Sequence, residues 1–361
     1  MNMPPQFDDQ KLARRLWEAF TEVERREGLS LLMRYQEPGG AQKDRVVGAG
    51  WLGSRIPNLT PERTMISAGA QAAIVAVLGV LANRGDVICT EAMAYPGLRT
   101  AAARLGLEVL RLELDDEGIL PTALAKACRE VGVKALCCTP TLQNPTTATM
   151  SLARREEIIA VARRHRLAIL EDDAYGRLPD PALPALAALA PDLTWHIAGL
   201  AKLVSPALRI AYVAAPDAQG AVQVAAQLRA ISGMASPITA AAATHRISTG
   251  LASAALAAIR SETRARRRIA AEALGNVAAE PADAFHPWLR LPSPWSRGTF
   301  LAALRSHEIS VVPSDAFATS GDPPEAVRIG LGAPRTRDDL ARALSTIAQV
   351  LTPPQPSRSY V

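Results

Sequence analysis

One lysine of this 361-residue chain stands where its side-chain amine could act as a nucleophile. Lys202 comes shortly after the apolar run 195–198, which predicts a buried strand, and its neighbours at 199–201 are small or apolar. Because such surroundings solvate an ammonium ion poorly, they favour the neutral amine. We therefore expect the amine of Lys202 to be available for reaction with an aldehyde.

A carboxylate and an arginine lie near this lysine in the sequence. Asp172 follows the apolar run 168–170, a second strand candidate, and Arg209 comes shortly after Lys202. Open α/β folds bind ligands at the carboxyl ends of parallel strands, so we expect these side chains at one sheet edge. They suit a cofactor with an aldehyde, a basic ring nitrogen and a phosphate. Pyridoxal 5'-phosphate has all three.

Each of these residues taken alone has a simpler interpretation. A single lysine is most often a surface charge, and acidic residues after a strand are often a helix cap or a turn. His196, in the strand candidate 195–198, could be a base, but we favour a structural role for it.

The composition is that of a globular protein with more than one core. With 361 residues, 48% of them hydrophobic and 21% charged, two domains are expected. The net charge of +5 is mildly basic, and we interpret the arginine-rich run 264–268 as a solvated helix face. No apolar run predicts a membrane span, and the first residues resemble no signal or transit peptide. We expect a cytoplasmic protein that binds neither nucleic acid nor membranes.

The cysteines give no sign of a metal site or of a disulfide framework. Their spacing matches neither pattern, and most of them lie in predicted strands, where a free thiol packs as a small hydrophobe. A reducing compartment fits this usage, and no metal is expected. The four are Cys89, Cys128, Cys137 and Cys138.

Strand and helix patterns alternate along most of the chain, which predicts an α/β fold with a mostly parallel sheet covered by helices on both faces. A smaller α+β unit should follow, with strands at 287–291, 309–312 and 327–331. The expected domain limits are an N-terminal arm and helix at 1–40, a large domain at 41–235, a small C-terminal domain at 236–352 and a disordered tail at 353–361. The strand candidates of the sheet are 64–66, 86–90, 107–110, 133–138, 168–172, 195–198 and 210–214.

A turn of small residues predicts an anion site. Gly69, Ala70 and Gln71 join the strand candidate 64–66 to a long apolar helix. Backbone N–H groups at such a helix start are free to bind an anion. The turn is not G-x-G-x-x-G, which counts against a dinucleotide-binding fold.

Several motifs, taken in order, resemble those of one enzyme family. They are Tyr-Gln-Glu-Pro-Gly-Gly (35–40), Ala-Gly-Ala-Gln (68–71), Ala-Tyr-Pro-Gly (94–97), Pro-Thr-Leu-Gln-Asn-Pro-Thr (140–146), Glu-Asp-Asp-Ala-Tyr-Gly (171–176) and Val-Arg-Ile-Gly (327–330). Over about residues 30–350 the chain resembles class I/II aminotransferases, which are pyridoxal-phosphate enzymes of fold type I. It is most similar to the aminotransferase-like domain of the MocR branch of GntR regulators, without room for their DNA-binding domain.

The resemblance implies an architecture and a set of residue roles. A large domain with a seven-stranded sheet, a smaller C-terminal domain and a homodimer with active sites at the interface are expected. Lys202 would hold the cofactor as a Schiff base and move the substrate α-proton, Asp172 would pair with the ring nitrogen, and Arg328 would clamp the α-carboxylate. The other implied contacts are Asn144 and Tyr175 at the ring 3-oxygen, with Asn144 also beside the substrate, Tyr95 on the ring face, Gly69, Ala70, Gln71 and Arg209 at the phosphate, and Tyr35 at the phosphate of a partner subunit.

The chain departs from the family pattern around the phosphate. Gly199, Ala201 and Ala70 stand where relatives carry serines, so hydroxyl donors are missing. A hydrogen bond to a charged group contributes about 1.5–3 kcal/mol, so weaker cofactor binding is expected unless Ser205 compensates.

An aminotransferase acting on an α-amino acid is our first hypothesis. One alternative is a pyridoxal-phosphate enzyme of secondary metabolism that eliminates or replaces a β or γ group, with S-adenosylmethionine as one candidate donor. Another is a sensor domain that binds the cofactor without turnover. Lys202, Asp172 and Arg328 would serve both enzymatic reactions, so these alternatives stay open at this point.

Overall fold

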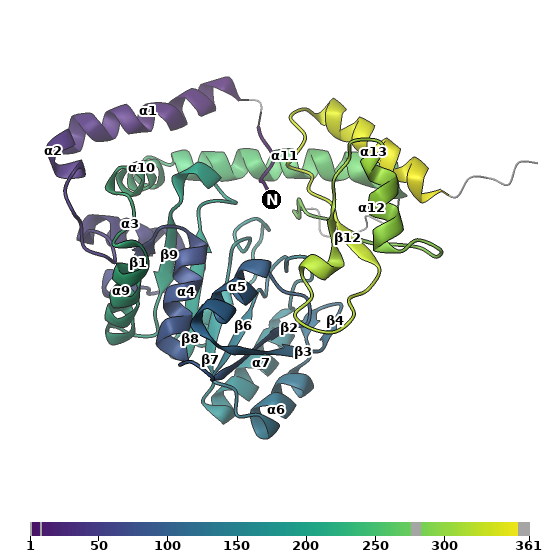
Figure 1. The fold of residues 1–361 in the computed structure, drawn as a ribbon. Coiled ribbons are helices and arrows are strands. Elements are labelled where there is room, and N and C mark those ends of the chain that lie inside the picture. Colours follow the sequence, from purple (N-terminus) through teal and green to yellow (C-terminus); the bar gives the residue numbers. More distant parts are fainter. Residues whose placement is uncertain (1, 8, 276–282, 353–361) are drawn as a thin grey trace, which may run out of the picture.

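The computed structural model describes residues 2–7, 9–275 and 283–352, and a seven-stranded sheet lies at its centre (Figure 1). The strand order is β1-β9-β8-β7-β6-β2-β3. Within this sheet β9 runs antiparallel to both of its neighbours and the other pairs are parallel, which confirms the predicted mostly parallel sheet. The strands are β1 (Thr64–Ser67), β2 (Val87–Glu91), β3 (Glu108–Leu112), β6 (Ala135–Cys138), β7 (Ala168–Asp172), β8 (Thr194–Gly199) and β9 (Ala211–Ala214).

Apolar residues on both sides of these strands explain why helices cover both faces of the sheet. Leu170 of β7 packs in one apolar cluster and its neighbour Ile169 in another, because successive side chains of a strand point to opposite faces. The first cluster includes α4 (Ala70–Leu81), α5 (Pro96–Leu105) and α9 (Ala218–Ser232). The second includes α6 (Pro121–Glu130), α7 (Leu152–His165) and α8 (Leu186–Leu189).

A smaller sheet and a group of helices lie at the side of the large sheet. The three strands have the order β10-β12-β11 (Trp288–Arg290, Ala326–Arg328 and Val312–Pro313). The long helix α11 (Leu251–Leu274) runs from the neighbourhood of α10 (Pro237–Ser248) to that of α13 (Arg337–Leu351) (Figure 1). The remaining helices are α1 (Gln10–Glu27), α2 (Leu29–Leu32), α3 (Gln42–Leu52) and α12 (Arg297–Arg305), with 3-10 turns at Pro61–Arg63, Pro206–Leu208 and Ser314–Ala316.

One predicted strand was wrong over most of its length, and some elements, among them α12 and a β-hairpin, were not predicted. In place of a strand at 309–312, Ile309 belongs to the turn that ends α12, where its N–H bonds to Leu304, and pairing with β12 begins at Val312. The capping box formed by Ser296 and Thr299 starts α12, a signal that the sequence contained. The hairpin of β4 (Leu114–Asp115) and β5 (Gly118–Ile119) was also missed.

The domain limits remain a prediction. α10, at the start of the expected small domain, packs on α1 and α3, whereas α11 packs on α13. The expected tail at 353–361 lies outside the described residues. Among the helices of the described ranges, none combines the length and the apolar character that a bilayer crossing needs.

Candidate active site

The carboxyl ends of β7 and β8 bring an acid and a lysine to the same sheet edge. Asp172 is the last residue of β7 and is paired in register with Ile197 of β8. β8 ends at Gly199, and the turn that follows carries Lys202. Parallel pairing therefore places these side chains as the sequence predicted.

Asp172 is an acid with an unsatisfied oxygen. Its Oδ1 is buried and receives no hydrogen bond from the part of the chain that the structure describes. Burial, together with the nearby charge of Asp173, raises the pKa of Asp172 to about 6, although Lys202 acts in the opposite direction. A cation beside Oδ1 would both satisfy this oxygen and stabilise the ionised carboxylate.

Lys202 is a poorly solvated amine. Burial lowers its pKa to about 8, and the positive charges of Arg328 and Arg209 add to this effect while Asp172 opposes it. Its Nζ donates a hydrogen bond to the main-chain oxygen of Asn2. At pH 7 about a tenth of this amine is uncharged, the form that a nucleophile requires and that an ordinary lysine populates far less. Its role in catalysis stays a prediction.

Arg328, at the end of β12, joins the small sheet to this site. Its Nη1 donates to Asn144 Oδ1 at 2.6 Å, and its guanidinium carbon lies 4.8 Å from the centre of the Phe317 ring. Its Nε is buried without a partner among the described residues. Burial lowers the pKa of Arg328, but the group stays a cation, so it has a free donor for an anionic ligand.

Tyr175 and His286 form an aromatic wall beside Arg328. The ring centres of Tyr175 and His286 lie 4.7 Å apart, and His286 Nε2 lies 3.3 Å from the main-chain oxygen of Gln143. Burial and then the charge of Arg328 lower the pKa of His286 to about 3, so this ring is neutral. No local motif pointed to His286, because only the pairing of β10 with β12 brings it here.

The sequence predicts an anion site at the start of α4, and the structure places Arg209 against it. Gly69 has φ +94°, and a Cβ on it would lie 2.6 Å from Arg209 Nη2, so the guanidinium packs directly on this glycine. No side chain of the described residues caps the helix, so its first N–H groups, at Ala70 and Gln71, are available to a ligand. A Cβ on Gly199 would lie 3.6 Å from Ala70 Cβ, so these two positions without hydroxyls are neighbours.

Three other predicted residues lie in different surroundings. Tyr95 precedes α5, and its ring lies over Gly97 together with the Gln71 side chain. Ser205 Oγ accepts from the N–H of Ala207 at 3.3 Å and lines a cavity of about 320 Å³ under the N-terminal segment, so its compensating role stays a prediction. Tyr35 is 95% exposed, and its contact with a partner also stays a prediction.

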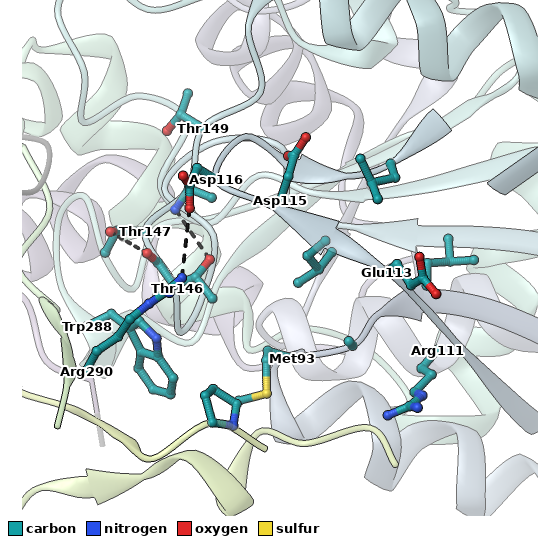
Figure 2. Close-up of a pocket in the computed structure, with 16 residues that line it drawn as sticks. Met93, Arg111, Glu113, Asp115, Asp116, Thr146, Thr147, Thr149, Trp288 and Arg290 are labelled. Atoms are coloured by element: carbon teal, nitrogen blue, oxygen red, sulfur yellow. Dashed lines mark hydrogen bonds and ion pairs between the residues drawn. The ribbon is translucent and has the colours of Figure 1, made fainter. Parts of the chain in front are cut away.

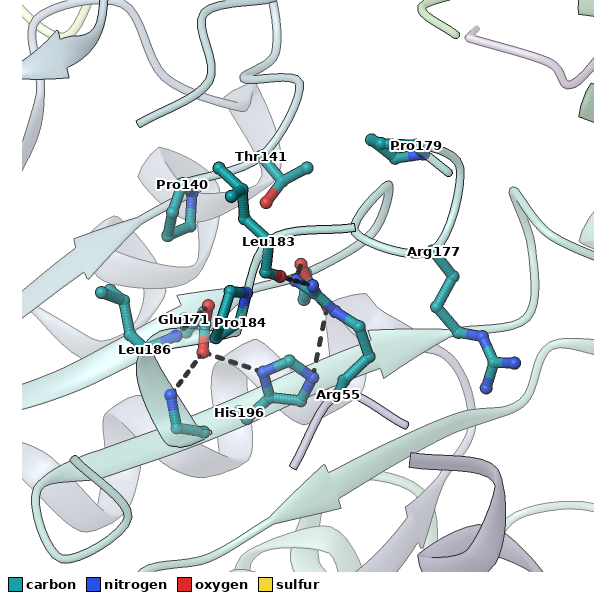
Figure 3. A network of polar contacts seen from close by, with 12 residues as sticks. Arg55, Pro140, Thr141, Glu171, Arg177, Pro179, Leu183, Pro184, Leu186 and His196 are labelled. Carbon is teal, nitrogen blue, oxygen red and sulfur yellow. Dashed lines mark hydrogen bonds and ion pairs between the residues drawn. The ribbon is translucent and has the colours of Figure 1, made fainter. Parts of the chain in front are cut away.

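Buried charged side chains pair with one another next to Asp172, at the carboxyl end of β7 (Figure 3). Arg55 binds Asp173 through two hydrogen bonds of 3.0 Å, and His196 Nδ1 lies 2.9 Å from Glu171 Oε2. Glu171 also accepts from two backbone N–H groups at the start of α8. This geometry agrees with a structural role for His196, whereas Arg55 was not foreseen from the sequence.

A wide cavity of about 1190 Å³ lies elsewhere, between the β4–β5 hairpin and β10 (Figure 2). Thr146 and Trp288 line it, but Lys202, Asp172 and Arg209 do not. The cofactor residues predicted from the sequence therefore lie outside this cavity. In the described ranges, no three His, Cys, Asp or Glu side chains are grouped so that they could hold a metal ion.

These groups lie on a mostly parallel seven-stranded sheet with a smaller sheet beside it, and comparison with known proteins gives the family of the chain. Residues 2–347 match the family model of aminotransferase class I and II. The chain therefore belongs to this aminotransferase family.

Curated relatives include regulators and an enzyme. The uncharacterized HTH-type transcriptional regulator YdeF of Bacillus subtilis is 29% identical over 292 residues, which are 80% of this chain and 63% of the regulator. The 2-aminoadipate transaminase of Thermus thermophilus is 26% identical over 92% of this chain and 85% of its own length. The chain thus spans less than two thirds of the regulator YdeF.

Solved structures share the fold. The α-aminoadipate aminotransferase LysN of Thermus thermophilus, in complex with N-(5'-phosphopyridoxyl)-L-leucine, has a TM-score of 0.88 at 21% identity, over 97% of this chain and 90% of that one. The kynurenine aminotransferase of Pyrococcus horikoshii has a TM-score of 0.86, also at 21% identity, with the same coverage.

The residues of the site fit pyridoxal 5'-phosphate, the cofactor of this family. The free oxygen of Asp172 matches a protonated ring nitrogen, and the amine of Lys202 matches the aldehyde. The start of α4 and Arg209 match the phosphate.

The buried pair of His196 and Glu171 predicts a pH-dependent stability. Burial disfavours the charged imidazole, but the pairing with Glu171 outweighs this and raises the pKa of His196. Its stabilising effect is complete below the unfolded value of about 6.5 and is lost as the pH rises through the raised folded value. The gap in unfolding free energy between wild type and His196→Gln should therefore narrow above about pH 6.5 in urea titrations. His307→Gln, at an exposed position, is the control; a gap independent of pH would contradict the ion pair.

The missing hydroxyl at the phosphate predicts a gain of affinity. Ala70→Ser should strengthen pyridoxal-phosphate binding about tenfold or more, since one more hydrogen bond to a charged group contributes about 1.5–3 kcal/mol. Equilibrium dialysis measures this directly. The matched control is Ala218→Ser, because Ala218 is likewise the first residue of a helix, α9, away from the site. Equal affinities of the two variants would show that the phosphate does not bind at α4.

Proposed function

We propose that this chain is a pyridoxal-phosphate-dependent aminotransferase that acts on an amino acid with a free α-carboxylate. The observation that carries the proposal is the pairing of a depressed lysine pKa with an unsatisfied aspartate oxygen at one sheet edge. Such perturbed groups cluster at functional sites. The family match supports the same conclusion.

The cofactor, when bound, supplies an electron sink for negative charge at the substrate α-carbon. The chain supplies orientation and electrostatics. We infer that Asp172 keeps the ring nitrogen protonated, that Arg209 and the start of α4 hold the phosphate, and that Asn144 and Tyr175 face the 3-oxygen. Tyr95 would cover one face of the ring.

Lys202 and Arg328 would then act on the substrate. Arg328 would bind the α-carboxylate, and its bond to Asn144 fixes the direction of the guanidinium. Holding the carboxylate orients the α-proton for transfer to Nζ of Lys202. With a pKa of about 8, this amine can both accept and return a proton near neutral pH.

We further propose a cytoplasmic homodimer. Trp17, Met33 and Tyr35 are 73%, 70% and 95% exposed, and all three lie in or just after α1 and α2. A second copy would cover these side chains and bring Tyr35 to the other phosphate. The four cysteines are free, which suits a reducing compartment.

A second candidate is a sensor that binds cofactor and amino acid without turnover. The regulators among the relatives favour it.

Elimination or replacement would use the same residues as transamination. Two readouts distinguish the three functions. A sensor releases no product. An eliminating enzyme releases a product and keeps its cofactor in the aldehyde form, whereas a transaminase converts the cofactor to pyridoxamine phosphate.

The test is a panel of amino acids with the purified protein. Wild type should convert bound cofactor to pyridoxamine phosphate and release a keto acid, and the rate should rise with pH up to about 8 as Lys202 loses its proton. Lys202→Ala should lose at least about 10²–10⁴-fold in rate, since it lacks the proton-transfer group. Lys134→Ala, at an exposed lysine, is the control. A Lys202→Ala variant as fast as wild type would refute the proposal.

A further inference from the structure

The segment of residues 2–7 enters the middle of the molecule. Figure 1 shows the chain descending from the start of α1 to a point between the large sheet and the small one. Asn2, Pro4 and Pro5 are buried there. No site residue was predicted from the sequence at positions 2–7.

Asn2 contacts two of the residues assigned to the cofactor. Its Nδ2 donates to the hydroxyl oxygen of Tyr175 at 2.8 Å, and its main-chain oxygen accepts from Nζ of Lys202. Its Oδ1 is buried and has no partner among the described residues. One asparagine thus bridges the amine and the phenol.

A pyridoxal ring would need the same two groups. Its aldehyde carbon and its 3-oxygen are adjacent substituents, and the proposed function gives the first to Lys202 and the second to Tyr175. Asn2 therefore contacts the amine and the phenol that the cofactor would contact, although the bonds differ, since the Tyr175 oxygen accepts from Asn2 and its O–H would donate to the 3-oxygen. Because Asn2 and the cofactor would have to lie against the same two side chains, each would exclude the other.

We propose that residues 2–7 form a strap that competes with pyridoxal phosphate for Lys202 and Tyr175. The proposal rests on the proposed function, because it takes the roles of these two residues from it. In the strapped arrangement Asn2 holds both groups, and cofactor loading displaces the segment. The apparent affinity for the cofactor then equals the intrinsic affinity multiplied by the fraction of molecules whose strap is open.

A glycine in the small unit holds the strap in place. A Cβ on Gly332 would overlap the main-chain oxygen of Met3 and would lie 2.8 Å from the carbonyl carbon of Pro4. The main chain of the strap thus packs directly against the main chain at Gly332. Pro4 and Pro5 restrict the free segment, which lowers the entropy lost on closing, and they bring no N–H groups that burial would leave unpaired.

The same glycine provides a test that leaves Lys202, Tyr175 and Asn2 unchanged. Gly332→Ala should expel the strap, because its methyl group would overlap the Met3 oxygen. Gly330→Ala is the matched control, since a Cβ there meets nothing within 4 Å and neither glycine has a positive φ. A chain lacking residues 2–7 is a second variant that does not depend on how Gly332→Ala folds.

The readout is the binding constant of added pyridoxal phosphate, followed by its absorbance change and by equilibrium dialysis. Gly332→Ala and the shortened chain should bind about tenfold more tightly than wild type if the strap is closed in about nine molecules of ten, and Gly330→Ala should match wild type. Unchanged or weaker binding in both strap variants, with wild type still binding, would overturn the strap alone. No binding by any of the proteins would overturn the proposed function, and the strap with it.

Discussion

The free Oδ1 of Asp172 is the constraint on which the site depends. A buried carboxylate without a partner for one oxygen is costly, and its raised pKa of about 6 expresses that cost. The cost is removed when a cation lies against Oδ1, and a protonated ring nitrogen is such a cation. In the role proposed for it, the acid would therefore favour the form of the cofactor that withdraws electrons from the substrate.

The surrounding structure keeps this acid in place and ionisable. Asp173, the next residue, is neutralised by Arg55, and Glu171, the residue before, is paired with His196. Although burial opposes it, the pairing with His196 and the α8 backbone holds the pKa of Glu171 at about 2. Three successive acids can stand at one strand end because the two outer ones have partners and the middle one is left for the ligand.

Local patterns in the sequence were sufficient to predict the large sheet and the edge at which two of the candidate site residues lie. Each strand is a short apolar run, and parallel order alone brings Asp172 and Lys202 to one edge. Residues whose role depends on distant partners were missed. Arg55 binds an acid 118 positions away, Asn2 a tyrosine 173 positions away, and His286 a carbonyl group 143 positions away. The strand expected at 309–312 failed because the turn ending α12 takes Ile309 first.

The state of the ring nitrogen in bound cofactor tests the central claim most directly. Pyridoxal phosphate labelled with nitrogen-15 in the ring reports protonation of that nitrogen by its chemical shift. With wild type, the shift should be that of a protonated nitrogen throughout the neutral range, and with Asp172→Asn it should be that of a neutral ring. An unprotonated nitrogen in wild type, or the same shift in both proteins, would contradict the role assigned to Asp172.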